Sequence, residues 1–334
     1  MKDTGGIKAF LLRFGFSYAI INRLMLAVML IAEIIVFSSF TPYFFQLENL
    51  LPVGREIATL GIVAIGQTMC ILTAGFDLSV GGSAAIAGIV VGYLCAPSKL
   101  GLPYSLAFTV GMFVVLLVGI INGTLITKVK INPLIATLSM NFMLGGAILI
   151  ISKQPITVNT AAFKLIGATT FGAIRFPLPI VTLLALYMVF GLMLKHTVFG
   201  RQVYCTGGNA QAARVAGINV ESVVFRVYVI SSVLAGFAGI QLASRIATSN
   251  PNIGSTYGLE SIAAAVLGGT VLAGGEGNMF GSFLGVLVMG ILSNGLIMIG
   301  LPQAWRNIAT GVVLIIAVAL QNVTKNAQKI KRGA

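Results

Sequence analysis

A polar stretch from Lys195 to Arg226, KHTVFGRQVYCTGGNAQAARVAGINVESVVFR, separates two blocks of almost continuous apolar sequence. Within it, Asn209 is a candidate helix N-cap, the alanine-rich residues that follow favour a helix, and Gly217 is a candidate helix stop. A short helix with small side chains on its surface can be approached closely by another protein. We therefore expect a docking helix for a partner here, with an ordinary amphipathic connector as the alternative.

The composition of the chain is that of a membrane protein. Hydrophobic residues make up 57% of its 334 residues, charged residues only 9%, and the mean hydropathy is +1.00. A water-soluble domain of this composition would expose enough apolar surface to aggregate. The 40 glycines fit closely packed transmembrane helices. We therefore expect an all-α polytopic membrane protein.

The apolar segments predict about ten transmembrane helices in one transmembrane domain that covers residues 1–334. The expected parts are the first five spans in 24–194, a cytoplasmic coupling loop at 195–226, the last spans in 227–321 and a cytoplasmic basic tail at 322–334.

Two apolar windows, 83–97 and 259–275, are too short to cross a bilayer unaided. Glycines lead into the first window and interrupt the second. Short, glycine-broken segments at matching positions in two halves of a chain are typical of an inverted repeat with a pathway near the membrane midplane. We therefore expect two inverted-repeat halves with broken or short helices near that plane.

The basic residues indicate the orientation in the membrane. The net charge is +13, and the 21 Lys and Arg residues lie mainly in loops and at the two ends of the chain. With both termini inside, the cytoplasmic segments hold about twice as many of them as the outer loops, which agrees with the positive-inside rule. No basic patch carries interleaved aromatic residues, so we expect contact with membrane lipid and not with nucleic acid.

Polar residues within apolar segments are the candidates for a solute pathway. Asp77 stands out because an unpaired carboxylate inside a membrane is costly. Two roles are open for it, and they are compatible. Asp77 can cap the helix that begins near Ser79 and hold a break between two half-helices, and it can contact a polar solute. The remaining pathway candidates are Phe76, Ser79, Thr137, Asn141 and Asn294.

The sequence lacks the residue sets of common catalytic sites. His196 is its one histidine, and neither H-E-x-x-H nor G-x-S-x-G beside a base occurs. No G-x-x-x-x-G-K-[ST] loop is present either, so any ATP used in transport is expected to be hydrolysed on a separate chain. We expect no catalytic residue, metal site or cofactor on this chain. A stand-alone transporter coupled to an ion remains an alternative, although such proteins usually carry more buried ionisable groups.

Four stretches resemble the ribose-type permease subunits of binding-protein-dependent ABC importers, a class that also serves branched-chain amino acids. They occur in the same order over nearly the whole chain: TAGFDLSVGG (Thr73 to Gly82), NPLIATLSMN (Asn132 to Asn141), FGRQVYCTGGNAQAARVAGINV (Phe199 to Val220) and AAAVLGGTVLAGGEGNMFGSFLGV (Ala263 to Val286). The resemblance implies a bacterial inner-membrane subunit that passes a sugar or sugar-like solute. Its implied partners are a second permease chain, identical or a close paralogue, two ATPase subunits and a periplasmic solute-binding protein.

The resemblance also implies which residues contact the ATPase. The part of the polar stretch that matches the family's coupling helix supplies Gly207, Gly208, Asn209, Ala212, Ala213, Arg214, Ala216 and Gly217. One position departs from the family's pattern, because Phe76 stands where a small aliphatic residue is usual. The departure bears on the solute, for which a pentose, a hexose, a furanose-like molecule and a nucleoside all stay open, and not on the fold.

Overall fold

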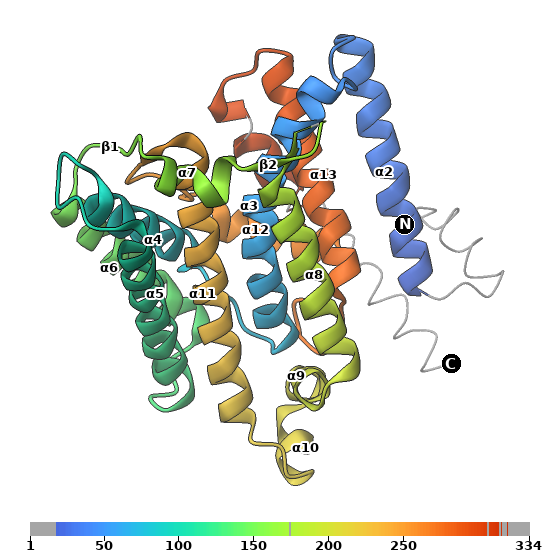
Figure 1. Ribbon diagram of the computed structural model, residues 1–334. Helices are drawn as coiled ribbons and strands as arrows, with labels where there is room; N and C mark the ends of the chain where they lie inside the picture. The colour runs from blue at the N-terminus through green and yellow to red at the C-terminus, as the bar shows by residue number, and fades with distance from the viewer. Residues whose placement is uncertain (1–17, 174, 306, 314, 316–318, 320–334) are drawn as a thin grey trace.

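The chain forms a bundle of long apolar helices (Figure 1). The structure is a computed structural model that describes residues 18–173, 175–305, 307–313, 315 and 319. Six of the described helices are long and apolar enough to cross a membrane: α3 (Leu47–Leu72), α5 (Tyr104–Thr127), α6 (Pro133–Ile151), α8 (Leu178–His196), α11 (Val220–Ile246) and α13 (Met279–Met298). Further apolar helices are α2 (Tyr18–Phe40), α4 (Val80–Cys95) and α12 (Tyr257–Leu267).

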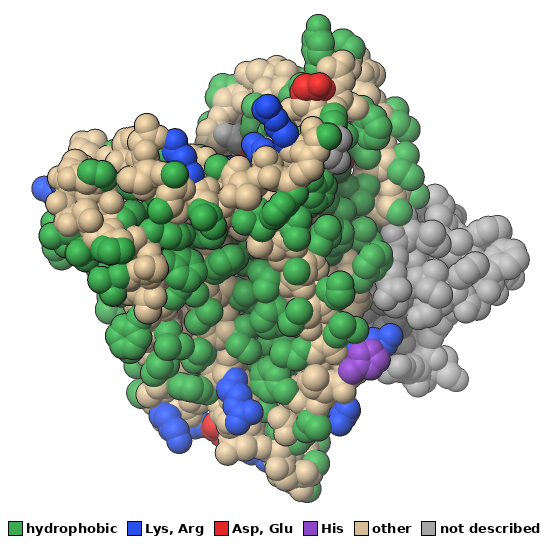
Figure 2. Space-filling view, viewed as in Figure 1, with side chains coloured by type: hydrophobic (Ala, Val, Ile, Leu, Met, Phe, Trp, Pro, Cys, Tyr) green, Lys and Arg blue, Asp and Glu red, His purple; other side chains and the backbone are tan. Residues whose placement is uncertain are grey.

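The helices differ in how much of their apolar surface the protein itself covers. In α3, 89% of the most apolar window is buried, whereas the fraction is 28% in α6 and 22% in α8. Large apolar side chains such as Phe142, Ile150 and Met188 are exposed on the outer helices. Figure 2 shows hydrophobic side chains over the middle of one face, with Lys and Arg toward both ends. An exposed apolar band of this kind is favourable in contact with lipid and unfavourable in contact with water. The chain is therefore a multi-pass membrane protein.

Two sets of three helices share the same order along the chain. The 26-residue α3 is followed by the short α4 and then by α5, and the 27-residue α11 is followed by the short α12 and then by α13. α3 and α11 pack against each other and run in opposite directions (Figure 1). The packing is reciprocal, since α4 and α5 lie against α11 while α12 and α13 lie against α3.

Backbone conformation explains where the short helices are interrupted. At the break between α3 and α4, Ala74 has a φ of 61°, and directly after α12, Gly269 has a φ of 89°. A helix cannot continue through such left-handed residues. By contrast, α6 begins sharply, because the Asn132 side chain accepts a hydrogen bond from the Leu134 N–H (2.9 Å).

The two ends of the bundle carry different structures (Figure 1). One end carries the short helix α7 (Ala161–Ala168) and two antiparallel pairs of strands, which are β1 (Ile156–Thr157) with β4 (Thr248–Ser249) and β2 (Thr170–Phe171) with β3 (Phe176–Pro177). The other end carries α9 (Val198–Gly208) and α10 (Ala210–Val215).

The chain is mostly helical, as predicted, with four two-residue strands in addition. Between residues 24 and 194, where five spans are predicted, four described helices (α3, α5, α6 and α8) are long and apolar enough to cross a membrane, and α2 and α4 contribute shorter apolar stretches. The number of spans therefore stays a prediction. The last predicted span is described only in part, and the basic tail at 322–334 and the chain before residue 18 lie outside the described residues.

Candidate functional site

Asp77 lies in the break between the end of α3 at Leu72 and the start of α4 at Val80, and its side chain is fully buried. Its Oδ1 accepts hydrogen bonds from the backbone N–H of Ser79 (3.0 Å) and from the Ser79 hydroxyl (2.6 Å). Its Oδ2 accepts a hydrogen bond from the Ser231 hydroxyl on α11 (2.8 Å). The carboxylate is therefore solvated by the protein, which offsets the cost of burying it.

The polar contacts continue from the break to α5. The Asn122 amide, fully buried on α5, donates to the Ser79 hydroxyl (2.8 Å). Because that hydroxyl also donates to Asp77, one chain of side chains joins the break, α5 and α11. Sequential hydrogen bonds of this kind hold a buried polar network in one arrangement.

Two side chains of α6 complete the start of α4. The Thr137 hydroxyl accepts a hydrogen bond from the Leu78 N–H (3.1 Å), and Asn141 Oδ1 accepts one from the Gly82 N–H (3.0 Å). The first N–H groups of a helix have no partner within the helix itself. Thr137 and Asn141 thus act as caps supplied by a neighbouring helix, at the place where the sequence predicts a break.

The structure separates the last two pathway candidates. Phe76 is half-buried and packs against the cluster formed by Ile71 of α3 and by Ile262, Ala265 and Val266 of α12. Its carbonyl accepts a hydrogen bond from the Tyr228 hydroxyl (3.1 Å). Asn294 lies near the far end of α13 and exchanges amide hydrogen bonds with Asn49 in the first turn of α3 (3.1 and 3.2 Å). Five of the six candidates therefore meet at the break, and Asn294 does not.

The predicted short helix in the polar loop is present as α10. The Asn209 side chain accepts hydrogen bonds from the N–H groups of Gln211 (3.0 Å) and Ala212 (2.9 Å), and Gly217 ends the turn with a φ of 82°. Ala213 faces the protein, whereas Ala212, Arg214, Ala216 and Gly217 are exposed and Val215 is 87% exposed. The helix α9 before it was not predicted.

Gly207, near the end of α9, lies directly against the backbone at the end of α3. A Cβ atom there would overlap the Leu72 carbonyl oxygen and lie 2.7 Å from the backbone nitrogen of Gly275, which itself donates to the Leu72 carbonyl (3.0 Å). We call this three-way contact of Leu72, Gly207 and Gly275 the glycine junction. The neighbouring Gly208 has open space where a Cβ would stand. The junction joins the polar loop to the α3–α4 break and to the loop before α13.

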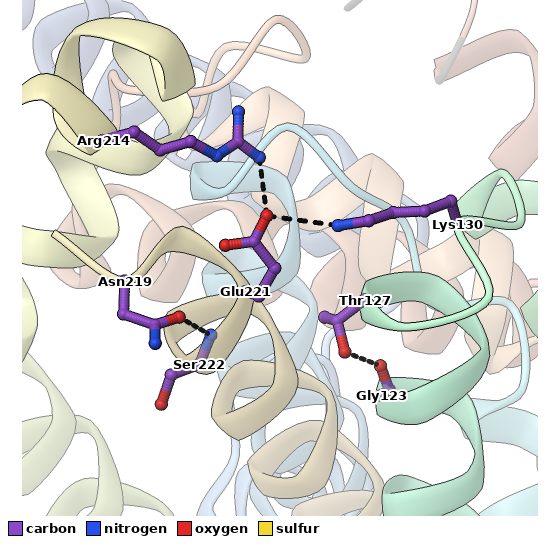
Figure 3. A network of polar contacts seen from close by, with 7 residues as sticks. All are labelled: Gly123, Thr127, Lys130, Arg214, Asn219, Glu221 and Ser222. Carbon is purple, nitrogen blue, oxygen red and sulfur yellow. Dashed lines mark hydrogen bonds and ion pairs between the residues drawn. The ribbon is translucent and has the colours of Figure 1, made fainter.

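A surface network links α10 to α11 and to the turn between α5 and α6 (Figure 3). Glu221, in the first turn of α11, accepts from Arg214 of α10 (2.9 Å) and from Lys130 in the turn between α5 and α6 (3.1 Å). The Asn219 side chain caps α11 by accepting from the Ser222 N–H (2.9 Å). The network shows that the polar loop and the α5–α6 turn lie at the same end of the bundle.

Sequence reasoning missed the partners of the candidate residues. Ser231, Asn122 and Tyr228 complete the site around Asp77, and Leu72 and Gly275 complete the glycine junction. The available signal for Asn122 and Ser231 was a polar residue inside an apolar span, which is also what a hydroxyl or amide with a purely structural role produces. Among the residues that the structure describes, no cluster of His, Cys, Asp or Glu is arranged to hold a metal ion.

Comparison with known proteins gives a consistent result over most of the chain. The chain is 37% identical to the ribose import permease protein of Bacillus subtilis strain 168, over 86% of this chain and 88% of that protein. It is 34% identical to the fructose import permease protein of Rhizobium meliloti (83% and 78%), and 30% identical to the autoinducer 2 import system permease protein of Salmonella paratyphi B (92% and 93%). No solved structure matches it significantly.

A family model supplies the assignment. Residues 49–318 match the model described as the permease component of the branched-chain amino acid transport system. The match begins in α3 and continues past α13, so it includes the Asp77 break, the polar loop and both sets of three helices. The chain is therefore a transport subunit, not an enzyme, and belongs to the branched-chain amino acid transport system permease family.

Proposed function

We propose that this chain forms the translocation pathway for a sugar or sugar-like solute in an ABC importer of the bacterial inner membrane. The relatives at 30% to 37% identity are import permeases named for ribose, fructose and autoinducer 2. The polar break beside Asp77, deep within an apolar bundle, supports a pathway for a polar solute, because broken helices in transporters are tolerated where they border such a pathway.

In this function the sets α3–α5 and α11–α13 are inverted repeats of a chain of about ten spans, with both termini in the cytoplasm. The opposite directions of α3 and α11 and their reciprocal packing support the repeat. The distribution of Lys and Arg supports the orientation. The permease acts with a second permease chain, identical or paralogous, and takes solute from a periplasmic binding protein.

ATP is bound and hydrolysed on two separate ATPase subunits, which dock on α10 and the end of α9. Ala212, Val215 and Ala216 support this, because they present a small, uncharged and exposed surface at one end of the bundle. The observation that carries the coupling role is the glycine junction, since a displacement of α9 reaches the α3–α4 break without passing through a flexible side chain.

The test is reconstitution of the tagged chain with its ATPase and binding-protein partners in lipid vesicles. We expect both partners to be required for ATP-dependent uptake of ribose or fructose. The Ala212→Trp variant should lose the ATPase on purification, because the bulky ring blocks close docking. The control is Leu100→Trp, at an exposed position outside α9 and α10 (57% exposed), which should keep it. Recovery of the chain alone, with uptake driven by an ion gradient, would instead favour a stand-alone secondary transporter.

A further inference from the structure

A polar cavity of about 450 Å³ lies between α3, α12 and α13, beside the segment 247–256 that separates α11 from α12. The chain has only eight Asp and Glu residues, and two of them, Glu56 and Glu260, line this one cavity. Other lining residues that bear on its chemistry are Asn252, Tyr257, Ser293 and Asn307. The volume is within the range of small-molecule sites, about 300–1,000 Å³.

The cavity lies at the break after α11, which corresponds in the second set of helices to the break after α3 that holds Asp77. The break after α3 faces Ser231 on α11, the long helix of the other set, and the third helix of its own set, α5. The break after α11 likewise adjoins Glu56 on α3 and Ser293 on α13. The first break is filled, since Asp77 is 0% exposed, and the second is hollow. Transporters bind solute at such paired breaks, and here the hollow one has room for it.

We propose that this cavity binds the transported solute, an uncharged polyhydroxylated molecule whose hydroxyl groups donate to Glu56 and Glu260. This inference rests on the proposed function and names the site at which the solute is held. Carboxylates accept hydroxyl hydrogen bonds, the Asn252 and Asn307 amides both donate and accept, and the Tyr257 ring offers an apolar face to the C–H groups of a sugar.

The surrounding charge favours a neutral ligand over a cation. Arg245 lies within electrostatic reach of both Glu56 and Tyr257. Its positive charge offsets part of the negative charge of Glu56, so a cation in the cavity would meet a weaker field than that of two uncompensated carboxylates. A carboxylate has several acceptor lone pairs, so it can accept hydrogen bonds from a neutral solute's hydroxyl groups in addition to its contacts within the protein.

The test compares two substitutions on the same helix in the reconstituted importer. Glu56→Gln and Glu48→Gln each replace a carboxylate of α3 with an amide of equal size, but Glu48 is exposed and does not line the cavity. With saturating binding protein loaded with ribose or fructose, we expect Glu56→Gln to lower the sugar taken up per ATP hydrolysed on the order of tenfold, because a charged acceptor is lost. ATP hydrolysis and subunit recovery should stay normal, and Glu48→Gln should match the wild type.

A second variant, Ser293→Phe, fills the cavity and should also lower uptake per ATP with assembly retained. Normal uptake per ATP in both Glu56→Gln and Ser293→Phe would overturn the cavity and leave the proposed function intact. Wild-type vesicles that take up neither sugar would refute the proposed function and the solute class with it. If Glu56→Gln lowers uptake only when external sodium is present, the cavity binds a cation, and the proposal that it binds the sugar is refuted.

Discussion

Asp77 illustrates how one charge is held inside an apolar bundle. Three hydrogen bonds, two from Ser79 and one from Ser231, reach a carboxylate that has no exposed surface. Hydrogen bonds to an ionised acceptor are stronger than those between neutral groups, and their loss leaves a buried oxygen without solvation. Each donor therefore contributes to holding the α3–α4 break in place.

We predict that Ser231→Ala lowers the free energy of unfolding by about 1.5–3 kcal/mol, because Asp77 Oδ2 loses its hydroxyl donor. The matched control is Ser232→Ala, on the same helix. Its hydroxyl is also buried but has no hydrogen-bond partner among the described residues, so its removal should change stability little. The measurement is the thermal unfolding midpoint of each variant purified in detergent. Equal shifts in the two variants would contradict a specific role for Ser231.

The sequence predicts the buried charge of Asp77 but not the residues around it. A lone carboxylate between apolar segments is conspicuous, so Asp77 could be predicted. Ser231 could not, because it lies 154 residues away and hydroxyls in membrane helices usually bond their own backbone. Asn294 is also a polar residue inside an apolar span, and its partner could not be predicted either. Its amide pairs with Asn49, away from the break.

The polar loop consists of two helices that are held in different ways. α10 is tied to α11 and to the α5–α6 turn by the exposed ion pairs of Glu221, which contribute roughly 0–1 kcal/mol each. α9 is held by backbone contact at the glycine junction, and by a hydrogen bond from the Tyr204 hydroxyl to the Gly277 carbonyl (2.9 Å). Steric fit therefore dominates at α9, and charge matters little at α10.

We predict that Gly207→Ala disrupts assembly or uptake, whereas Gly208→Ala leaves both close to wild type. Alanine favours a helix more than glycine does, so any loss in the first variant comes from the overlap of its Cβ with the Leu72 carbonyl. At Gly208 a Cβ meets open space. Subunit recovery on purification and ATP-dependent uptake in vesicles are the measurements. A harmless Gly207→Ala would show that α9 can move away from α3 without consequence.

Local signals explain which of the two helices could be predicted. Asn209 and Gly217 mark the start and stop of α10 in the sequence itself, and both act there as expected. α9 begins at a Thr197 cap, but it ends in two glycines, which disfavour a helix interior. A glycine is needed at position 207 because the backbone of Leu72, a residue remote in sequence, lies against it. Hydrophobic periodicity carries no information about that contact.

The whole molecule is organised by its two ends. Lys130, Arg214 and Glu221 share one end, and α7 with the paired strands occupies the other. An ion pair between exposed side chains cannot span a bilayer, so the three charged residues face the same compartment. On the positive-inside rule, we propose that this end faces the cytoplasm.

We predict that a cysteine at Lys164, in α7, reacts with a membrane-impermeant thiol reagent from outside intact cells. Cysteines at Lys130 and Arg214 should react only after permeabilisation. Cys205, which is exposed in α9, must first be replaced so that it does not contribute. Labelling of positions 164 and 214 from the same side would contradict their placement at opposite ends of the bundle. Reversed labelling would change only the orientation of the bundle in the membrane.

The general architecture could be predicted because hydropathy reports directly on lipid contact. The number of spans stays a prediction, because α4 is apolar but too short to be counted as a span by its length alone. The reciprocal packing of α4 on α11 and of α12 on α3 was likewise out of reach, since it depends on contacts between the two halves of the chain.

The glycine junction also bears on how a displacement decays inside the bundle. Where two side chains meet, a small displacement can be absorbed by a change of rotamer. Where backbone meets backbone, no such adjustment is available, because planar peptides in hydrogen-bonded helices deform little. A short stroke of α9 must therefore carry Leu72 and Gly275 with it. The α3–α4 break and the loop before α13 would then begin to move in the same step.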